Sequence, residues 1–442
     1  MSRRRRRKIP QEPVEATIES MSHDGKGVAH LDGKALFIGG ALPDERVMFK
    51  YSRLNRRFDE GNTVEVLEAS PDRVEPKCLH AAICGGCTLQ HMDSDAQISA
   101  KQQVLLDNFE HLGKVAAETI LPPITGPVWG YRRKARLGVK DVVKKGKVLV
   151  GFREKGSPYL AELEQCEVLH PSVGLRLREL ATLIEGMDTH NRIAQIEVAV
   201  SDSDTALVFR NLDPLSEGDH KKLLDYAQAQ QLQAYLQPGG PDTVTPLWPE
   251  APSLSYRLDA YDVEITFEPG DFTQVNHEIN HQMIDRAIEM LELEPGERVL
   301  DLFCGLGNFT LPITRRAAAV VGVEGDATLV ERAKANAERN GIENAEFHVA
   351  DLADEHIDPP WLQGGFDKIL LDPARAGALE VLPTLAKLGT KRIVYVSCNP
   401  ATLARDAGEL VHTHGFRLVS AGVMDMFPHT GHVESIALFT RD

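Results

Sequence analysis

The C-terminal part of the chain is predicted to be an α/β domain built on an open, largely parallel sheet. The first observation is the apolar run Val299–Leu302, which fits a strand buried on both faces and leads into a turn containing Gly305 and Gly307. Glycine lets backbone N–H groups in such a turn approach a ligand closely. The second observation is that three further apolar runs follow, at residues 319–323, 345–350 and 366–371. Successive buried strands of this kind are typical of a doubly wound sheet.

An acidic residue stands at or near the C-terminal end of each of these strands: Asp301, Glu324, Asp351 and Asp372. Ligands of open α/β sheets bind at this edge, and Glu324 follows its strand where a carboxylate can accept hydrogen bonds from ribose hydroxyls. A single Asp after a strand is more often a helix cap, but four acidic residues in order, one of them Glu, indicate a cofactor rim. Thr310 replaces the third glycine of a dinucleotide fingerprint, which disfavours a dehydrogenase. The pattern fits best an S-adenosylmethionine pocket of the class I methyltransferase type.

The length and composition of the chain indicate a multidomain globular protein. Its 442 residues, 42% of them apolar, suffice for about two to four domains with their own cores. No apolar run approaches the roughly 20 residues of a membrane span, and the arginine-rich residues 1–8 lead into no apolar signal core. We therefore expect a cytoplasmic protein. In a reducing compartment, its six cysteines indicate metal binding or catalysis before disulfides.

The net charge of −16 argues against a nucleic-acid partner until its distribution is considered. Residues 1–60 hold 13 Lys and Arg against 9 Asp and Glu, and residues 131–155 hold 10 against 2. The local density of positive charge governs contact with phosphates, because salt screens charges that lie farther away than about 10 Å. Either cluster alone fits a solvated face or a tail. Together they favour RNA or DNA as a partner.

Short strands at hairpin spacing indicate a small five-stranded β-barrel between residues 13 and 70. Turn dipeptides such as Asp-Gly separate the strands, which are expected at Val14–Glu19, Gly27–Leu31, Lys34–Ile38, Arg46–Tyr51 and Asn62–Leu67. The segment Ser22–Ala29 followed by Phe37–Glu45 resembles a TRAM domain, an OB-like RNA-binding module. A generic spacer is the alternative, but three basic residues on the last hairpin favour RNA binding: Arg53, Arg56 and Arg57.

Three cysteines stand close together in sequence, Cys78, Cys84 and Cys87, with two glycines between the last pair. Glycines let the backbone curl so that both sulfurs face one ion. Cys166 is the other cysteine in this part of the chain and completes a set of four, although it also fits an ordinary buried thiol. The spacing predicts a metal site, and it suits zinc as well as an iron–sulfur cluster.

The sequence divides into four parts. A helix at residues 96–113 and a mixed α/β region at residues 120–265 follow the cysteines. In this region, glycine and proline predict a loop at residues 237–252, a helix is expected near Glu217–Gln230, and strands are expected near Lys134–Val139, Leu149–Arg153, Ile196–Val200 and Ala206–Phe209. This region contains no catalytic constellation and is expected to dock the substrate through residues 131–155. The predicted parts are a basic tail at 1–12, the barrel at 13–70, a cysteine-containing and central RNA-binding domain at 71–265, and an S-adenosylmethionine-dependent methyltransferase domain at 266–442.

A cysteine occupies the position expected of a nucleophile. Cys398 directly follows the apolar run Arg392–Ser397, at the same edge of the sheet as the predicted cofactor carboxylates. A buried structural thiol is the commoner case, but the context favours catalysis. The last two predicted strands, Phe416–Met424 and His432–Phe439, form a terminal hairpin. The segment Asp425–Glu434 lies between and within them and brings two histidines and Glu434 toward the same edge as candidates for a general base.

Four motifs resemble those of the RNA (uracil-C5)-methyltransferase family: Asp301–Asn308, Leu371–Arg375, Ser397–Pro400 and Phe427–Glu434. With the barrel and the four cysteines, the resemblance covers nearly the whole chain and extends to the 23S ribosomal RNA branch of the family, which carries a 4Fe-4S cluster. It implies Cys398 as the nucleophile, Glu434 as the base, and cluster ligands at Cys78, Cys84, Cys87 and Cys166. It further implies S-adenosylmethionine contacts from Gln274, Phe303, Asn308, Glu324, Asp351 and Asp372.

The resemblance also implies a reaction. The Cys398 thiolate adds to carbon 6 of uracil, which makes carbon 5 nucleophilic enough to take the methyl group; Glu434 then removes the carbon-5 proton and the thiolate leaves. The target base must leave its stack to reach such a pocket. The alternatives are a tRNA uracil-C5 methyltransferase, a DNA cytosine-C5 methyltransferase, which usually presents Pro-Cys where this chain has Ser397-Cys398, and an RNA-binding iron–sulfur redox sensor. We expect a monomer whose partner is 23S ribosomal RNA.

Overall fold

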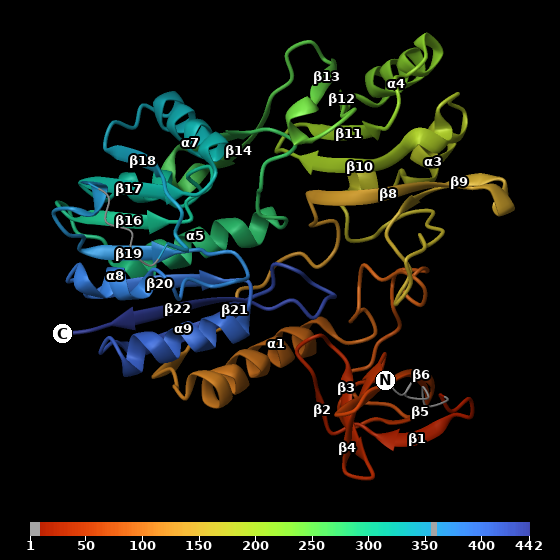
Figure 1. Cartoon of the computed structure of the whole chain (residues 1–442), viewed down its shortest axis with the longest axis horizontal. Coiled ribbons are helices and arrows are strands. Elements are labelled where there is room, and N and C mark those ends of the chain that lie inside the picture. The colour runs from red at the N-terminus through yellow and green to blue at the C-terminus, as the bar shows by residue number, and fades with distance from the viewer. Residues whose placement is uncertain (1–8, 355–359) are drawn as a thin grey trace, which may run out of the picture.

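Figure 1 shows the computed structural model of the protein, which describes residues 9–354 and 360–442. The chain forms three parts, each built on a sheet. The N-terminal sheet lies at the bottom of the view, the central sheet at the upper right and the C-terminal α/β part at the left. The arginine run at residues 1–8, which begins the predicted basic tail, lies outside the described residues.

Among the described residues, the N-terminal sheet has six strands in the order β1-β5-β6-β4-β3-β2, one more than predicted. The predicted first strand is divided by a bend at Ile18, whose N–H donates to Glu45 O. The bend lets β1 pair with β5 and β2 pair with β3, at opposite ends of a sheet that packs around buried side chains such as Phe49. The strands are β1 (Val14–Thr17), β2 (Ser20–Met21), β3 (Gly27–Leu31), β4 (Lys34–Gly39), β5 (Arg46–Leu54) and β6 (Phe58–Glu68).

The central sheet has the order β13-β12-β11-β10-β8-β9 within the described part of the chain. The four predicted strands and the predicted helix of this region are confirmed, with ends that shift by a few residues. The stretch 237–252, predicted to be a loop, contains the short strand β13, which is tolerated because an edge strand can accommodate Pro246. The elements are β8 (Lys134–Val142), β9 (Lys147–Gly151), α2 (Pro171–Gly174), α3 (Leu177–Glu185), β10 (Ile193–Val200), β11 (Thr205–Asn211), α4 (Glu217–Gln230), β12 (Gln233–Leu236) and β13 (Thr245–Trp248).

The C-terminal sheet, as far as the structure describes it, has the order β18-β17-β16-β19-β20-β22-β21-β7. The neighbours from β18 to β20 are parallel, whereas β22 runs antiparallel between β20 and β21. The strands predicted from the apolar runs and the terminal hairpin are therefore confirmed. They are β16 (Arg298–Leu302), β17 (Ala319–Glu324), β18 (Ala345–Val349), β19 (Lys368–Leu371), β20 (Arg392–Ser397), β21 (Arg417–Met424) and β22 (Glu434–Thr440).

Helices cover both faces of this sheet, as Figure 1 shows. Three of them share a core with Val299 and Leu370: α5 (His277–Leu291), α6 (Thr310–Thr314) and α7 (Ala327–Arg339). The other face, with Leu300 and Ile369, packs against α1 (Ser94–Asn108), α8 (Leu382–Lys387) and α9 (Pro400–His412). Neighbouring residues of one strand point to opposite faces, so an inner strand of this sheet must be apolar throughout.

The segment after the cysteines lies with the C-terminal part in space. Helix α1 buries Ile98, Val104 and Leu105 in the core under β21 and α9. The short strand β7 (Thr119–Ile120) then extends the C-terminal sheet by pairing in parallel with β21. This segment precedes residue 266, the predicted start of the methyltransferase domain, so the predicted boundary in sequence does not separate the two parts in space.

No helix in residues 9–354 and 360–442 combines the length and apolar character that crossing a membrane requires.

Candidate active site

The glycine-rich turn after β16 has the predicted form. Phe303 adopts φ 66°, a left-handed conformation that is unusual for a residue with a side chain. Its N–H donates to Val323 O at 2.8 Å, which ties the start of the turn to the next strand. Gly307 has φ 90°, and a Cβ at this position would approach the Leu311 side chain to 2.9 Å. The turn therefore requires glycine at position 307.

The four predicted rim carboxylates do not all have the same role. Glu324 accepts hydrogen bonds from Gly305 N at 3.2 Å and from Gly325 N at 2.7 Å, so it lies against the glycine turn. The cap of helix α7 is supplied by Asp326, which accepts from Thr328 N, and Glu324 is not needed for it. Asp351, at the exposed end of β18, accepts from Ala353 N at 3.0 Å.

Two of the carboxyl groups hold protons unusually tightly. Burial, followed by the negative charges of Asp372 and Glu324, raises the pKa of Asp301 to about 7, although a hydrogen bond from Thr310 opposes the shift. Burial and Glu324 raise the pKa of Asp372 to about 7. These three acidic groups are therefore close enough to interact, as their positions at the ends of neighbouring strands predicted.

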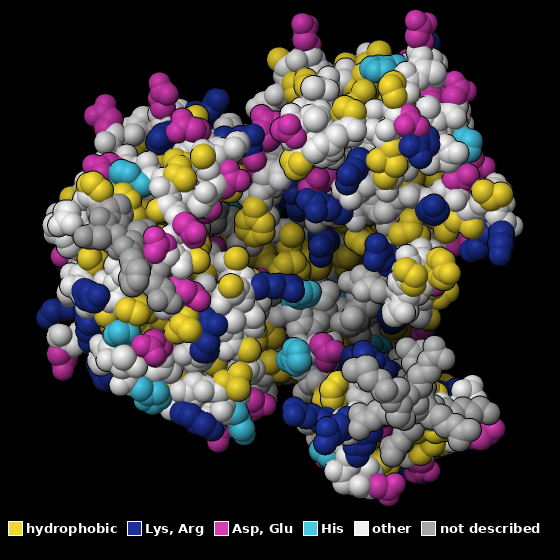
Figure 2. Space-filling view, in the orientation of Figure 1, with side chains coloured by type: hydrophobic (Ala, Val, Ile, Leu, Met, Phe, Trp, Pro, Cys, Tyr) yellow, Lys and Arg dark blue, Asp and Glu magenta, His cyan; other side chains and the backbone are white. Residues whose placement is uncertain are grey.

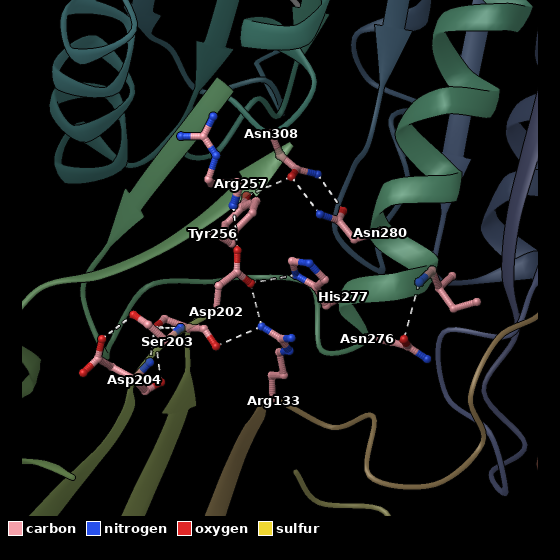
Figure 3. Close-up of polar contacts among 12 residues, drawn as sticks. Arg133, Asp202, Ser203, Asp204, Tyr256, Arg257, Asn276, His277, Asn280 and Asn308 are labelled. Atoms are coloured by element: carbon pink, nitrogen blue, oxygen red, sulfur yellow. Dashed lines mark hydrogen bonds and ion pairs between the residues drawn. The ribbon is translucent and has the colours of Figure 1, made fainter. Parts of the chain in front are cut away.

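Asn308 is held by two buried polar side chains that sequence reasoning missed (Figure 3). Its amide group exchanges hydrogen bonds with that of Asn280 on α5, at 2.9 and 3.1 Å. The hydroxyl of Tyr256, on β14 (Leu254–Leu258), donates to the same Oδ1 at 2.9 Å. Gln274 lines a small cavity with Tyr256 and Asn280, so the structure brings Gln274 and Asn308 to one wall of the site.

Cys398 lies directly after β20, as predicted, in a cleft of about 830 Å³. Residues from the N-terminal sheet, the cysteine segment and the C-terminal part line this cleft: His23, Lys26, Gly86, Arg375, Pro400 and His432. Burial, then the negative charges of Glu434 and Asp372, raises the pKa of the Cys398 thiol to about 11, and Arg375 opposes this shift. The resting cysteine is consequently a thiol.

Glu434 begins β22 and is buried near the same groups. Burial, then the charge of Asp372, raises its pKa to about 8, whereas the positive charges of Arg375 and Lys101 lower it. Cys398, Glu434, Asp372 and Arg375 thus influence one another's protonation, and the predicted nucleophile and base belong to one cluster. A carboxyl group with a pKa near neutrality is suited to general base catalysis.

Arg375 is the functional candidate that sequence reasoning did not single out. Its guanidinium group lies 3.1 Å from His432 Nδ1, and its carbonyl accepts from Asn399 Nδ2 at 3.0 Å. The signal in the sequence was its place in Asp-Pro-Ala-Arg, directly after a strand that ends at the cofactor edge. Among the positive charges that lower the pKa values of Cys398 and Glu434, that of Arg375 has the largest effect.

The two histidines considered as bases have other surroundings. His429 is 3% exposed and stacks on Trp129 with ring centroids 4.0 Å apart. Burial, followed by the charge of Lys101, lowers the pKa of His429 to about 4, so it is neutral. Burial also lowers the pKa of His432, which contacts Arg375. Glu434 is therefore the better-placed candidate.

All four predicted metal ligands, Cys78, Cys84, Cys87 and Cys166, line one cavity of about 310 Å³. The glycines of the cysteine loop allow this, because Gly85 donates to Arg153 O at 2.8 Å and a Cβ there would approach the same oxygen to 3.1 Å. Among the described residues, no three or more His, Cys, Asp or Glu side chains are arranged to hold a single metal ion. Arg375 and His432 line both this cavity and the Cys398 cleft, so the two are neighbours.

The basic residues at 131–155 are only partly available to a partner. Arg133 donates to Ser201 O and Asp202, both at 2.9 Å, in the network of Figure 3. Lys134 is largely buried against Glu197, and Lys145 and Lys147 both pair with Glu162. Figure 2 shows Lys and Arg side chains gathered around the hollow in the middle of this face.

Comparison with known proteins identifies the family. The model of the tRNA (uracil-5-)-methyltransferase family matches residues 185–359 and 362–442. The chain belongs to the RNA (uracil-C5)-methyltransferase family. It is 56% identical to the 23S rRNA (uracil(1939)-C(5))-methyltransferase of Alkalilimnicola ehrlichii and 53% identical to that of Alcanivorax borkumensis, over 99% of each chain. The prediction of an S-adenosylmethionine-dependent methyltransferase is thereby confirmed, and the DNA cytosine-C5 alternative is disfavoured.

A solved structure shares the whole fold. The tRNA (uracil-54, C5)-methyltransferase of Pyrococcus abyssi, solved in complex with S-adenosyl-L-homocysteine, matches with a TM-score of 0.74 at 24% identity. The match covers 96% of this chain and 99% of the archaeal one. The predicted class I methyltransferase fold of the C-terminal part is therefore confirmed.

Proposed function

We propose that the protein transfers a methyl group from S-adenosylmethionine to carbon 5 of one uridine in 23S ribosomal RNA. The observation that carries the proposal is the cluster of Cys398, Glu434 and Arg375 at the carboxyl edge of the C-terminal sheet, beside Asp372. The names of the bacterial relatives, which align over nearly their full length, support 23S ribosomal RNA as the substrate. A tRNA substrate is the second candidate, because the family model carries that name.

The residues at the cofactor edge fit S-adenosylmethionine. The Oδ1 atom of Asp301 is buried and has no hydrogen-bond partner within the described part of the chain, and the space beside the Cα of Gly305 is open to 4 Å. When bound, S-adenosylmethionine supplies an electrophilic methyl group. We assign its binding to six residues: Gln274, Phe303, Asn308, Glu324, Asp351 and Asp372. Glu324 accepts from the ribose hydroxyls in this proposal.

The remaining chemistry belongs to the side chains of the cleft. Cys398 loses its proton to the solvent of the open cleft and adds to carbon 6 of the uracil as a thiolate, whose formation the positive charge of Arg375 favours. Carbon 5 then takes the methyl group and carries both the methyl and a hydrogen. Glu434 accepts that proton, the bond between sulfur and carbon 6 breaks, and the thiolate is restored. The pKa of Glu434, raised to about 8, makes the ionised base increasingly available as the pH rises through that value.

The four cysteines fit a metal cluster better than a single ion. Thiolates are the usual ligands of both 4Fe-4S clusters and structural zinc. The volume of the cavity that the four cysteines line, about 310 Å³, supports the larger group. We therefore propose that Cys78, Cys84, Cys87 and Cys166 hold a 4Fe-4S cluster. Bound there, the cluster would join Cys78, Cys84 and Cys87 to Cys166 and so hold the cysteine loop, residues 78–87, against the central part.

We also propose that the N-terminal sheet is a TRAM domain that binds the RNA beside the target uridine. Its loop residues His23 and Lys26 line the cleft that contains Cys398. Arg53, on the longest hairpin, is 71% exposed, as an RNA contact requires. The central sheet would contribute Arg136, which is also 71% exposed. A ribosomal RNA substrate implies work in the cytoplasm, and a monomer remains our expectation.

The decisive experiment incubates the purified protein with labelled S-adenosylmethionine and ribosomal RNA from a strain that lacks the gene. We expect label in 5-methyluridine from the large-subunit RNA after digestion to nucleosides. Transfer RNA from the same strain is the competing substrate, and preferential labelling of that RNA would favour the second candidate. Label in another nucleoside, or none while the cofactor still binds, would refute the uracil-C5 assignment.

A further inference from the structure

Side chains of helix α1 bind the loop that connects β21 to β22. We name this loop, residues 425–433, the catalytic loop. Lys101 is only 2% exposed, and its Nζ donates to Asp425 Oδ1 at 2.7 Å and to Phe427 O at 2.9 Å. A buried lysine that pairs with a buried aspartate fixes both groups, because either charge alone would be costly there. The beginning of the catalytic loop is therefore held against α1.

Gln97, one turn earlier on α1, holds the middle of the same loop. Its Oε1 accepts from His429 N at 2.8 Å, and its Nε2 donates to Met92 O at 2.8 Å and to Leu89 O at 3.1 Å. The side chain is 1% exposed, and both its acceptor and its two donors are used. A buried amide with a complete set of partners specifies the distance between the segments that it joins.

The segment that follows Cys87 also forms hydrogen bonds to His429 of the catalytic loop. The backbone N–H groups of Thr88 and Leu89 both donate to His429 O at 2.9 Å. His429 itself has φ 65°, a left-handed conformation that a residue other than glycine adopts only when its surroundings hold it there. Gln97 thus joins three segments, namely α1, the cysteine segment and the catalytic loop.

The opposite side of the catalytic loop forms a wall of the cleft that contains Cys398. Thr430, His432 and Val433 line that cleft, and Glu434 is the next residue of the chain. We propose that Gln97 is a positioning residue that sets the catalytic loop so that Glu434 reaches the carbon-5 proton of the target uracil. The inference rests on the proposed roles of Cys398 and Glu434.

The geometry assigns Gln97 to one step of the reaction. Cys398 follows β20 and Arg375 follows β19, so the backbone of both residues lies outside the catalytic loop, and the Arg375 side chain contacts the loop at His432, three residues beyond the residue that Gln97 binds. Addition of the thiolate to carbon 6 and attack of carbon 5 on the methyl group should therefore survive a loosened loop. Transfer of the carbon-5 proton to the Glu434 carboxylate, which permits the carbon 6–sulfur bond to break, should not.

The test uses Gln97→Met, which keeps the length and bulk of the side chain but removes its hydrogen bonds. Gln103→Met is the matched control, because Gln103 is exposed on the same helix and donates a hydrogen bond to Asp107, four residues along that helix. RNA containing 5-fluorouridine separates the steps: fluorine at carbon 5 cannot leave as a proton, so the methylated covalent adduct accumulates. We expect Gln97→Met to form this adduct at nearly the rate of the wild type.

On ordinary uridine RNA, the same variant should turn over more slowly by on the order of 10- to 100-fold, the usual effect of misplacing a catalytic group by about 1 Å. RNA deuterated at carbon 5 should show a larger isotope effect in Gln97→Met than in the wild type, because proton removal becomes rate-limiting. The Gln103→Met control should match the wild type in every assay. Equal turnover of Gln97→Met and the control, or parallel losses of adduct formation and turnover, would overturn the proposal.

A second variant guards against misfolding of the first. Lys101→Met combined with Asp425→Asn removes the buried ion pair without leaving a charge unpaired, and it should give the same separation of adduct formation from turnover. Adduct formation and turnover that fall together in a variant that still binds S-adenosylmethionine would contradict the inference. If the wild-type protein forms no adduct with 5-fluorouridine RNA, the proposed function fails, and with it the premise of the inference.

Discussion

Arg375 and His432 line two thiol sites, the cleft with the single Cys398 and the four-cysteine cavity. The two sites differ in what stabilises the ionised form of their thiols. In the Cys398 cleft, burial raises the pKa of the thiol to about 11, while the charge of Arg375 lowers it. In the four-cysteine cavity, burial raises the pKa of Cys166 to about 11 and that of Cys87 to about 12, and the neighbouring cysteines add to the shift.

This difference in surroundings fits the two proposed roles, a nucleophile for Cys398 and metal ligands for the four cysteines of the cavity. A thiolate beside a guanidinium group can form, react with carbon and form again as a leaving group. Burial and the charges of neighbouring cysteines raise the pKa values of Cys84, Cys87 and Cys166, so these thiols cannot ionise together unless a cation binds among them. The same residue type is thus suited to transient chemistry in the cleft and to permanent coordination in the cavity.

The largest effect should come from removing the thiol of the cleft. We expect Cys398→Ala to lower methylation by on the order of 10⁴-fold or more, because no other group adds to carbon 6. Binding of S-adenosylmethionine, measured by calorimetry, should be retained. Measurable turnover in this variant would remove covalent addition from the mechanism.

Removing the cation of the cleft should have the next largest effect. Arg375→Gln withdraws a positive charge that lowers the pKa of both Cys398 and Glu434, so both values rise and less of each group is ionised at a given pH. Turnover near pH 7 should fall by on the order of 10²-fold. The acid limb of the pH–rate profile should move to higher pH, since Asp372 still raises the pKa of Glu434 and only Lys101 still opposes it. An unmoved limb would contradict this account.

Replacing a thiol of the cavity should affect the metal and the fold before the chemistry. Wild-type protein purified without oxygen should be brown and contain about four irons per chain, whereas Cys87→Ser should lose most of the iron. Its melting temperature should fall by on the order of 5 °C, because metal binding contributes to folding. Stoichiometric zinc without visible absorbance in the wild type would instead make the cavity a zinc site.

The smallest effect should come from a thiol that belongs to neither group. Cys304 is 4% exposed and packs beneath Gly322, with no cation among the groups that shift its pKa. Cys304→Ala should destabilise the protein by about 1 to 2 kcal/mol through the cavity it leaves. Adduct formation with 5-fluorouridine RNA should persist, and its loss would show that burial alone does not describe this thiol.

Most of the C-terminal fold could be predicted from the sequence because its inner strands must be apolar on both faces. The runs at 299–302, 319–323 and 366–371 carry that pattern, and each became a strand of the parallel sheet. The strands of the N-terminal sheet were predicted less accurately, because the bend at Ile18 depends on a hydrogen bond to Glu45 that no local pattern encodes. The strand at 245–248 was missed because its prolines and flanking glycines resemble a loop.

The site was predicted residue by residue where a side chain follows a strand, as Cys398 and Glu324 do. The supporting contacts were not predicted. Asn280 reaches Asn308 across 28 positions of sequence, and Gln97 reaches His429 across 332. Asn280 and Gln97 each lie on a helix. The spacing of apolar residues along that helix explains why the side chain is buried, but it does not indicate which residue the side chain binds.

The sequence by itself determined where the chemically important residues stand along the chain. It shows which turn needs glycine, which strand ends carry carboxylates and which strand end carries Cys398. These features follow from backbone conformation and from the alternation of side chains, both of which are local. Only the tertiary structure decided that helix α1 packs against β21 and that the four-cysteine cavity adjoins the Cys398 cleft. Such contacts depend on how whole surfaces fit together after the elements form, and a short stretch of sequence does not contain that information.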